Sequence, residues 1–175
     1  MESNVVRTER LVMRRAEVRD LGPLHAILAN AEAMRYWSTP PHASLHDSRE
    51  WLKGMMASPE SDSDDFVVEY QDEVIGKAGF WRLPEIGYIL HPHYWGRGLA
   101  RECLAALVDR AFHRFDMAAV TADVDPRNAA SLKLLGRLGF IETGRQSATI
   151  LVGDEWCDSV YLELPRDRWL TRIAS

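Results

Sequence analysis

The stretch HPHYWGRGLAREC, residues 91–103, constrains the fold more than any other part of the sequence. A β-like run ends at Leu90, and two glycines, Gly96 and Gly98, then precede a segment whose apolar residues recur with a period close to 3.6. N–H groups at a helix start lack intrahelical partners and carry partial positive charge, so this turn is a candidate anion site. A turn that only needs positive φ at either glycine would give the same pattern.

The rest of the chain alternates strand and helix patterns within a single predicted domain, residues 1–175. A strand, a helix and a second strand around the glycine turn imply a right-handed parallel crossover. Only three residues separate two earlier strands, which predicts a tight antiparallel hairpin. Strands are predicted at 11–15, 66–70, 74–81, 85–90, 118–124, 145–152 and 156–164, and helices at 20–28, 44–55, 99–115 and 129–138. Asp20 and Ser44 are the predicted N-caps.

Composition and charge narrow the class of protein. The formal net charge is −5 without a basic block, which argues against nucleic acid as the main partner. No apolar run reaches the ~20 residues that span a bilayer, so no membrane partner is expected. Cys103 and Cys157 have no metal-type spacing, and the N-terminus has no signal-peptide pattern, which favours a cytoplasmic protein. The acidic run SPESDSDD, 58–65, is expected to be a solvated turn.

Two segments resemble the GNAT superfamily of N-acetyltransferases, in particular its RimJ/RimL-like branch. They are EIGYILHPHYWGRGLARECL, 85–104, and VDPRNAASLKLLGRLGFIETG, 124–144. One departure is Trp95, which stands where the superfamily pattern often has Gln or Arg. The resemblance implies the α/β (α+β) GNAT fold, a mixed, mostly antiparallel sheet of about seven strands flanked by about four helices. The sheet is expected to splay open between its one parallel pair, 85–90 and 118–124.

The same resemblance implies acetyl-CoA as cosubstrate, without a metal. The pantetheine is expected to lie in the splay and to contact strand backbone and the amide of an asparagine. The pyrophosphate is expected at the glycine turn. The implied cofactor-binding residues are Ile89, Leu90, Trp95, Gly96, Arg97, Gly98, Leu99, Ala100 and Asn128.

Acetyl transfer to an amine needs an unprotonated amine, donors for the oxyanion and stabilisation of the departing thiolate. Glu85, at the start of the splayed strand, is the candidate base, although a solvated hairpin carboxylate would look the same. Ser131 is the candidate partner of the thiolate, with a helix-start role as the alternative. Many superfamily members place a tyrosine seven residues after the asparagine, but Leu135 stands there in this chain.

The acceptor is expected to be a primary amine, either a protein N-terminus or a small molecule. By resemblance, four residues lie in segments that line the acceptor pocket in related proteins, although the core is the favoured place for each of them: Tyr36, Trp37, His42 and Trp156. Two other functions stay open. One is a catalytically silent module that binds acyl-CoA, and the other is a dinucleotide-binding protein, although Arg101 replaces the third glycine of that fingerprint. The sequence leaves the oligomeric state, including a homodimer, undecided.

Overall fold

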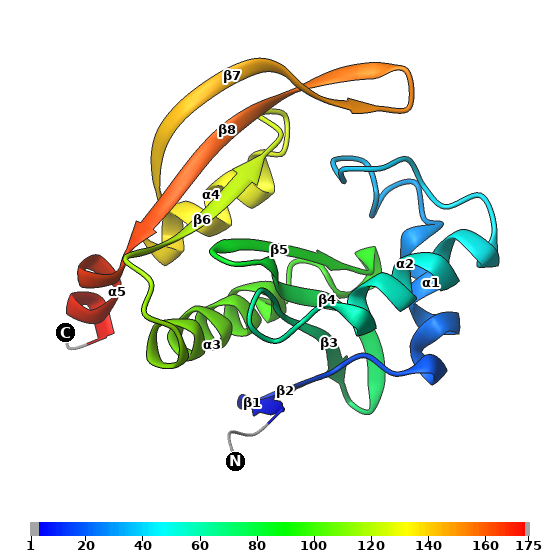
Figure 1. The fold of residues 1–175 in the computed structure, drawn as a ribbon, viewed down its shortest axis with the longest axis horizontal. Coiled ribbons are helices and arrows are strands. Elements are labelled where there is room, and N and C mark those ends of the chain that lie inside the picture. The colour runs from blue at the N-terminus through cyan, green and yellow to red at the C-terminus, as the bar shows by residue number, and fades with distance from the viewer. Residues whose placement is uncertain (1–3, 174–175) are drawn as a thin grey trace.

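A computed structural model describes residues 4–173, which form one eight-stranded sheet in the order β1-β2-β3-β4-β5-β6-β8-β7 (Figure 1). The N-terminal half contributes β1 (Val5–Arg7), β2 (Leu11–Arg14), α1 (Leu21–Leu28), α2 (Leu45–Ala57), β3 (Asp64–Tyr70), β4 (Glu73–Arg82) and β5 (Glu85–Leu90). The C-terminal half contributes α3 (Leu99–Arg114), β6 (Ala119–Val124), α4 (Ala129–Leu138), β7 (Ile141–Val152), β8 (Glu155–Pro165) and α5 (Arg166–Ile173). The predicted fold is confirmed, with one short strand and one C-terminal helix more than the sequence predicted.

Strands β5 and β6 form the one parallel pair of the described sheet, and they separate soon after they meet. Their register contains a single pair, Glu85 with Thr121, and the Thr121 N–H donates to the Pro84 carbonyl at 3.0 Å. Beyond that point the far end of each strand, at Leu90 and at Val124, has no partner in the other. The expected splay is therefore present, and it opens toward the carboxyl ends of both strands.

Helices cover the two faces of the sheet with different cores. On one face α3 buries an apolar stripe at helical spacing, which packs with β5, β6 and α4 residues in the larger cluster. On the other face α1 and α2 cover a smaller cluster that includes Val67 of β3 and Ile89 of β5. Because successive side chains of a strand point to opposite faces, Tyr88 belongs to the larger cluster and Ile89 to the smaller one. Each face of β5 thus serves a different compartment.

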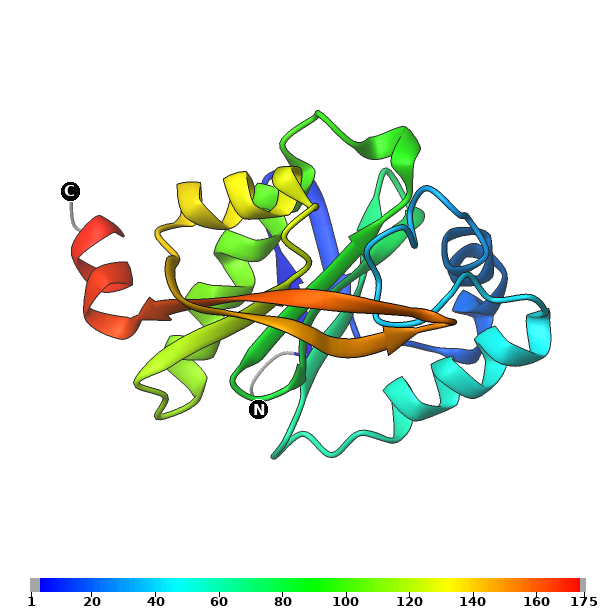
Figure 2. The ribbon, with the colours of Figure 1, turned by 90° about the horizontal axis from the view of Figure 1, so that it is seen from above.

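The β7–β8 hairpin arches away from the sheet and crosses above β5 (Figures 1 and 2). Its tip reaches the loop between α1 and α2, where a Cβ added at Gly153 would lie 3.6 Å from the Pro40 side chain. Arg127 reinforces this junction, since its Nη1 is 2.7 Å from Glu155 Oε1 and its guanidinium lies 5.8 Å from the Tyr36 ring centroid. The hairpin and the α1–α2 loop therefore meet above the sheet.

The expectation that 58–65 is a solvated turn is wrong at its C-terminal end. Asp64 and Asp65 are buried residues of β3. Asp64 lies 2.7 Å from Arg15 and 2.9 Å from Arg110, and Asp65 Oδ2 lies 2.7 Å from Lys77 Nζ. A carboxylate is tolerated in such a place only when cations replace its hydration.

The two predicted helix caps have different outcomes. Ser44 caps α2 as expected, because its hydroxyl accepts from the Asp47 N–H at 3.3 Å. Asp20 occupies the N-cap position of α1, but its side chain makes no capping bond there. Instead it accepts from the Glu17 N–H and pairs with Arg14 at 2.7 Å. The Asp20 carboxylate therefore bonds to Arg14 of β2 and to the Glu17 N–H instead of to the N-terminus of α1. Within residues 4–173, no helix is both long and apolar enough to cross a membrane.

Candidate functional site

Within residues 4–173, the glycine turn presents backbone donors that lack a helical acceptor at the start of α3. Gly96 and Gly98 have φ of 73° and 75°, a left-handed conformation that side chains rarely adopt. The first helical bond runs from the Glu102 N–H to the Gly98 carbonyl, so the preceding N–H groups of Leu99 and Ala100 have no helical acceptor. The glycines therefore satisfy both interpretations of the sequence. They permit the turn, and the turn exposes donors suited to an anion.

A cluster of side chains that the sequence did not reveal holds this turn in place. The Arg10 guanidinium pairs with Glu102 at 2.7 Å and donates to the Arg97 carbonyl at 3.0 Å. Thr8 donates to the same Glu102 carboxylate at 2.5 Å. Burial alone would raise the pKa of Glu102, but the hydrogen bonds from Thr8 and Arg10 bring it below its ordinary value. Thr8 and Arg10 belong to the TERL motif, residues 8–11, but their partner Glu102 lies more than ninety residues further along the chain.

The end of β5 directs its backbone groups to different sides. The His91 N–H donates to the Ile75 carbonyl of β4 at 2.8 Å. Since backbone groups alternate along an antiparallel strand, the N–H of Leu90 faces β6 across the splay, and that of Ile89 faces β4. The Leu90 carbonyl is already used, because Trp95 Nε1 donates to it at 2.9 Å. Of the two residues expected to contact a ligand through backbone, only Leu90 offers a donor to the splay.

On the opposite wall, the first turn of α4 places two predicted residues together. Asn128 is the N-cap, and its Oδ1 accepts from the Ser131 N–H at 3.1 Å. The Ser131 hydroxyl lies 2.6 Å from the phenol oxygen of Tyr88, which reaches across from β5. Burial raises the pKa of Tyr88 to about 12, partly offset by this hydrogen bond. Sequence reasoning missed Tyr88. Leu135, seven residues after Asn128, is 1% exposed and belongs to the core.

Glu85 opens β5 but does not lie beside Ser131. Its Oε1 accepts from Trp81 Nε1 at 3.0 Å, on the β4–β5 hairpin. Strand alternation puts Glu85 on the same face of β5 as Ile89, and Tyr88, which bonds Ser131, on the other face. Glu85 therefore lies at the closed end of the splay, where β5 pairs with Thr121, and on the opposite face of β5 from Tyr88 and its partner Ser131.

The candidate acceptor residues come from the two segments that meet at the hairpin tip. Tyr36 and Trp37 belong to the α1–α2 loop, and the Trp37 ring centroid lies 5.9 Å from Lys77 Nζ. His42 Nδ1 is 2.8 Å from Ser48 Oγ, and burial lowers the pKa of His42. Trp156 is 60% exposed on the hairpin. Trp37 and His42 thus have structural partners, while Trp156 has an accessible ring.

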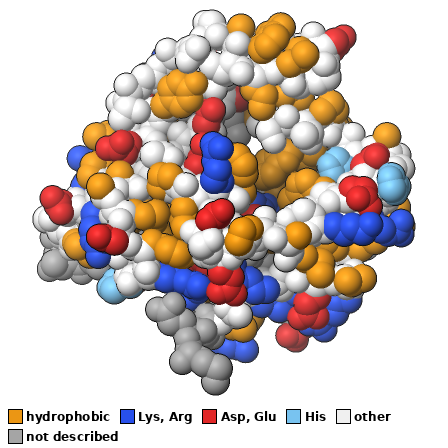
Figure 3. All heavy atoms as spheres, viewed as in Figure 1, with side chains coloured by type: hydrophobic (Ala, Val, Ile, Leu, Met, Phe, Trp, Pro, Cys, Tyr) orange, Lys and Arg blue, Asp and Glu red, His pale blue; other side chains and the backbone are white. Residues whose placement is uncertain are grey.

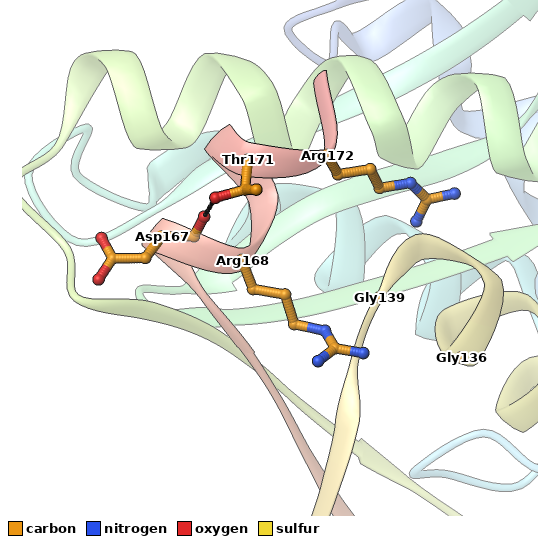
Figure 4. A pocket seen from close by; sticks show the side chains of 6 residues that line it. All are labelled: Gly136, Gly139, Asp167, Arg168, Thr171 and Arg172. Atoms are coloured by element: carbon orange, nitrogen blue, oxygen red, sulfur yellow. Dashed lines mark hydrogen bonds between the residues drawn. The ribbon is translucent and has the colours of Figure 1, made fainter. Parts of the chain in front are cut away.

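The molecular surface is hollowed between the β7–β8 hairpin and the body of the sheet (Figure 3). A recess of about 240 Å³ beneath the hairpin includes Pro126 and Ser159 in its lining. A larger recess of about 570 Å³ lies between α5 and the end of α4, lined by Gly139, Arg168 and Arg172 among others (Figure 4). None of the predicted site residues lines this larger recess. Across residues 4–173 no three His, Cys, Asp or Glu side chains gather in a way that could hold a metal ion.

Comparison with known proteins assigns the family. Residues 10–141 match the acetyltransferase (GNAT) domain family. The chain is 30% identical over 146 residues to an uncharacterized N-acetyltransferase, p20, of Bacillus licheniformis, covering 78% of this chain and 82% of the relative.

Solved structures match the fold over almost the whole chain. A spermidine N-acetyltransferase from Vibrio cholerae, in complex with CoA and spermine, superimposes with a TM-score of 0.79 at 22% identity, covering 93% of this chain and 99% of that one. The ribosomal-protein acetyltransferase RimL, in complex with coenzyme A, gives a TM-score of 0.84 at 19% identity, covering 94% and 99%. At these identities the likeness concerns the fold alone.

Proposed function

Because the chain belongs to the GNAT family of acetyltransferases, we propose that this N-acetyltransferase moves an acetyl group from acetyl-CoA to a primary amine by direct attack on the thioester. The observation that carries this proposal is the set of unpaired N–H groups at the start of α3, placed just beyond the splayed end of β5. The dinucleotide alternative is wrong, because the glycine turn follows an antiparallel hairpin within a GNAT sheet.

The backbone from Trp95 to Ala100 is the proposed cradle for the pyrophosphate of acetyl-CoA. Gly96 and Gly98, both in the left-handed conformation, have no side chains to keep a phosphate away from this backbone. The dipole of α3 adds positive potential there. The Leu90 N–H faces the splay and can donate to the thioester oxygen as negative charge develops there. The Asn128 side-chain oxygen is used in capping, so its amide N–H₂ is the group available to the pantetheine.

Direct attack of the amine on the thioester is consistent with the buried, protonated state of the Cys103 thiol. Cys103 is 1% exposed, and burial raises the pKa of its thiol well above the ordinary range. Its sulfur donates to Met13 Sδ at 3.2 Å within the core. A thiol held in this state is a poor nucleophile, because the thiolate is the reactive form. An acetyl-enzyme through Cys103 is therefore not part of the proposed mechanism.

Glu85 is the proposed base that takes the proton from the attacking amine, and Ser131 the proposed donor to the leaving thiolate. Their location toward opposite faces of β5 suits a reaction in which amine and thioester enter from different sides. The Trp81 indole donates to one Glu85 oxygen at 3.0 Å, and within residues 4–173 no hydrogen bond is made to the other oxygen. That second oxygen is the one available to an amine, directly or through water.

The acceptor is proposed to be a small amine or a flexible protein N-terminus. The solved neighbours include enzymes named for each class, a spermidine acetyltransferase and a ribosomal-protein acetyltransferase. The direct test is release of CoA thiol from acetyl-CoA with a panel of amino-acid amides, short peptides, polyamines and aminoglycosides. Release with at least one acceptor supports the proposal. Tight CoA binding with no release from any acceptor would instead indicate a silent acyl-CoA-binding module.

Glu85→Gln tests the base. We expect kcat to fall by about 10²–10⁴-fold and its pH profile to change, because the proposed base is removed. Glu163→Gln is the matched control, since Glu163 pairs with Thr121 two strands away in the same row. Its kcat should stay within about threefold of wild type. Equal losses in both variants would show a general field effect and remove Glu85 from its assigned role.

A further inference from the structure

A hydrogen bond between two hydroxyls crosses the splay, from Tyr88 of β5 to Ser131 at the start of α4. The two oxygens are 2.6 Å apart, and both side chains are only partly buried. Tyr88 is connected to the larger core through its ring, and Ser131 is fixed by the Asn128 cap. The two walls of the splay are thus joined by a bond whose members are each held in position by their own element.

Counting protons shows what this pair can do. A tyrosine and a serine together carry two hydroxyl protons, and their mutual hydrogen bond uses one of them. Within residues 4–173, neither hydroxyl has another recorded hydrogen-bond partner. One proton is therefore left to donate to a third atom. Either hydroxyl can donate in this bond; when Tyr88 donates to Ser131, it polarises the serine hydroxyl and strengthens the outward bond that Ser131 makes.

We infer that Tyr88 is a positioning residue that directs the Ser131 hydroxyl to donate a hydrogen bond to the CoA thiolate as it leaves. The inference rests on the proposed function and deepens it. In the step concerned, the carbon–sulfur bond of the tetrahedral intermediate breaks and its electron pair goes to sulfur. The proton that the amine loses goes to the base, and the proton that finally neutralises the thiolate comes from solvent.

The pair donates a hydrogen bond rather than a proton. The pKa of Tyr88 is raised to about 12, whereas a thiol titrates near ~8.5. Full transfer from the phenol to the thiolate would thus be unfavourable by roughly three orders of magnitude. In this proposal a tyrosine on β5 polarises the hydroxyl of Ser131, and that hydroxyl donates to the thiolate.

The first experiment measures the thiol pKa of enzyme-bound CoA from the ultraviolet absorbance of the thiolate, with bound desulfo-CoA as the blank. A charge-assisted hydrogen bond is worth about 1.5–3 kcal/mol, so Ser131→Ala should weaken the acidity of the bound thiol at least ~10-fold. Tyr88→Phe should weaken it less, by about threefold, and Ser131→Thr should preserve it. An unchanged thiol pKa in Ser131→Ala with CoA still bound would overturn the inference but leave the proposed function intact. Absence of CoA binding to the wild type would sink both.

The second experiment is a double-mutant cycle on kcat with one good acceptor. If Tyr88 acts through Ser131, the double variant should lose no more activity than Ser131→Ala alone, about 10²-fold. Additive losses would show two independent roles and contradict the inference. Tyr70→Phe is the matched control, because it removes a tyrosine hydroxyl for which no hydrogen bond is recorded in the described residues, and its kcat should be unchanged. If Tyr88→Phe changed only the melting temperature and the CoA affinity, the pair would have a structural role and the inference would be wrong.

Discussion

The two sides of the splay offer different kinds of groups to a ligand, backbone on one side and side chains on the other. On the side proposed to hold the cofactor, the groups that could meet a ligand are backbone donors at the glycine turn and the Leu90 N–H, all fixed by secondary structure. On the acceptor side, the candidates are side chains from the α1–α2 loop and the β7–β8 hairpin, joined through contacts at Pro40 and Arg127. Backbone donors survive most substitutions, whereas side chains on loops do not. A fold arranged in this way can keep one cosubstrate while its acceptor changes.

The cofactor side should fail when its backbone conformation is disturbed. Gly98→Val places a β-branched residue at φ 75°, where strain costs about 1–3 kcal/mol and the donors of α3 shift. We expect the Kd for CoA, measured by calorimetry, to rise by at least ~100-fold. Gly54→Ala is the control, because Gly54 lies in α2 with open space around it. That change should stabilise the fold by up to about 1 kcal/mol and leave CoA binding unchanged. Normal CoA affinity in a folded Gly98→Val protein would place the phosphates elsewhere.

The acceptor side should respond to loss of a side chain without loss of the fold. Trp156 is 60% exposed, so Trp156→Ala removes little buried area. We expect the acceptor KM to rise about tenfold, as for a truncated aromatic contact, with the Kd for CoA unchanged. Leu170→Ala is a matched exposed apolar truncation on α5 and should change neither quantity. A change in CoA affinity for Trp156→Ala would mean that the two sides are not separate.

The smallest effect is expected where a side chain supports the cofactor turn. The lowered pKa of Glu102 means that its bonds to Thr8 and Arg10 stabilise the fold above the ordinary carboxyl pKa, and that this contribution is lost as pH falls through the lowered value. Since Arg10 is 39% exposed, we expect Glu102→Gln to cost only about 0.5–1 kcal/mol at pH 7. Denaturant unfolding at pH 7 and near pH 3 should show that difference shrinking. CoA affinity should change less than about threefold, because the N–H groups remain. A larger loss of affinity would show that the turn depends on side chains.

The sequence predicted best the elements whose signals are local. The α3 helix begins at Leu99 as expected because a periodic apolar stripe follows a left-handed glycine, and α4 spans Ala129–Leu138 because Asn128 and Gly139 mark its ends. The short β1 strand was missed, since three residues contain no periodicity. The α5 helix was also missed.

The errors concern ion-pair and hydrogen-bond partners that only the folded chain brings together. An acidic run looks solvated until Arg15, just after β2, and two arginines of α3 are placed around Asp64. Asp20 looks like a cap until Arg14 is beside it. The cofactor turn could be proposed from residues 91–103, but the Tyr88–Ser131 bond could not, because it joins positions 43 residues apart across a gap in the sheet. Local pattern shows which groups exist, and tertiary structure decides which of them meet.

The contact between the β7–β8 tip and the loop at Pro40 has a consequence for how an acceptor would reach the space beneath the hairpin. With these segments joined above the sheet, we expect an acceptor to be threaded beneath the hairpin end-first instead of being laid onto an open ledge. A slender chain end passes through such an entrance, whereas a lysine in the middle of a rigid helix is excluded by its own neighbours. The hairpin would then select acceptors by their width, before any chemical group on the acceptor is recognised.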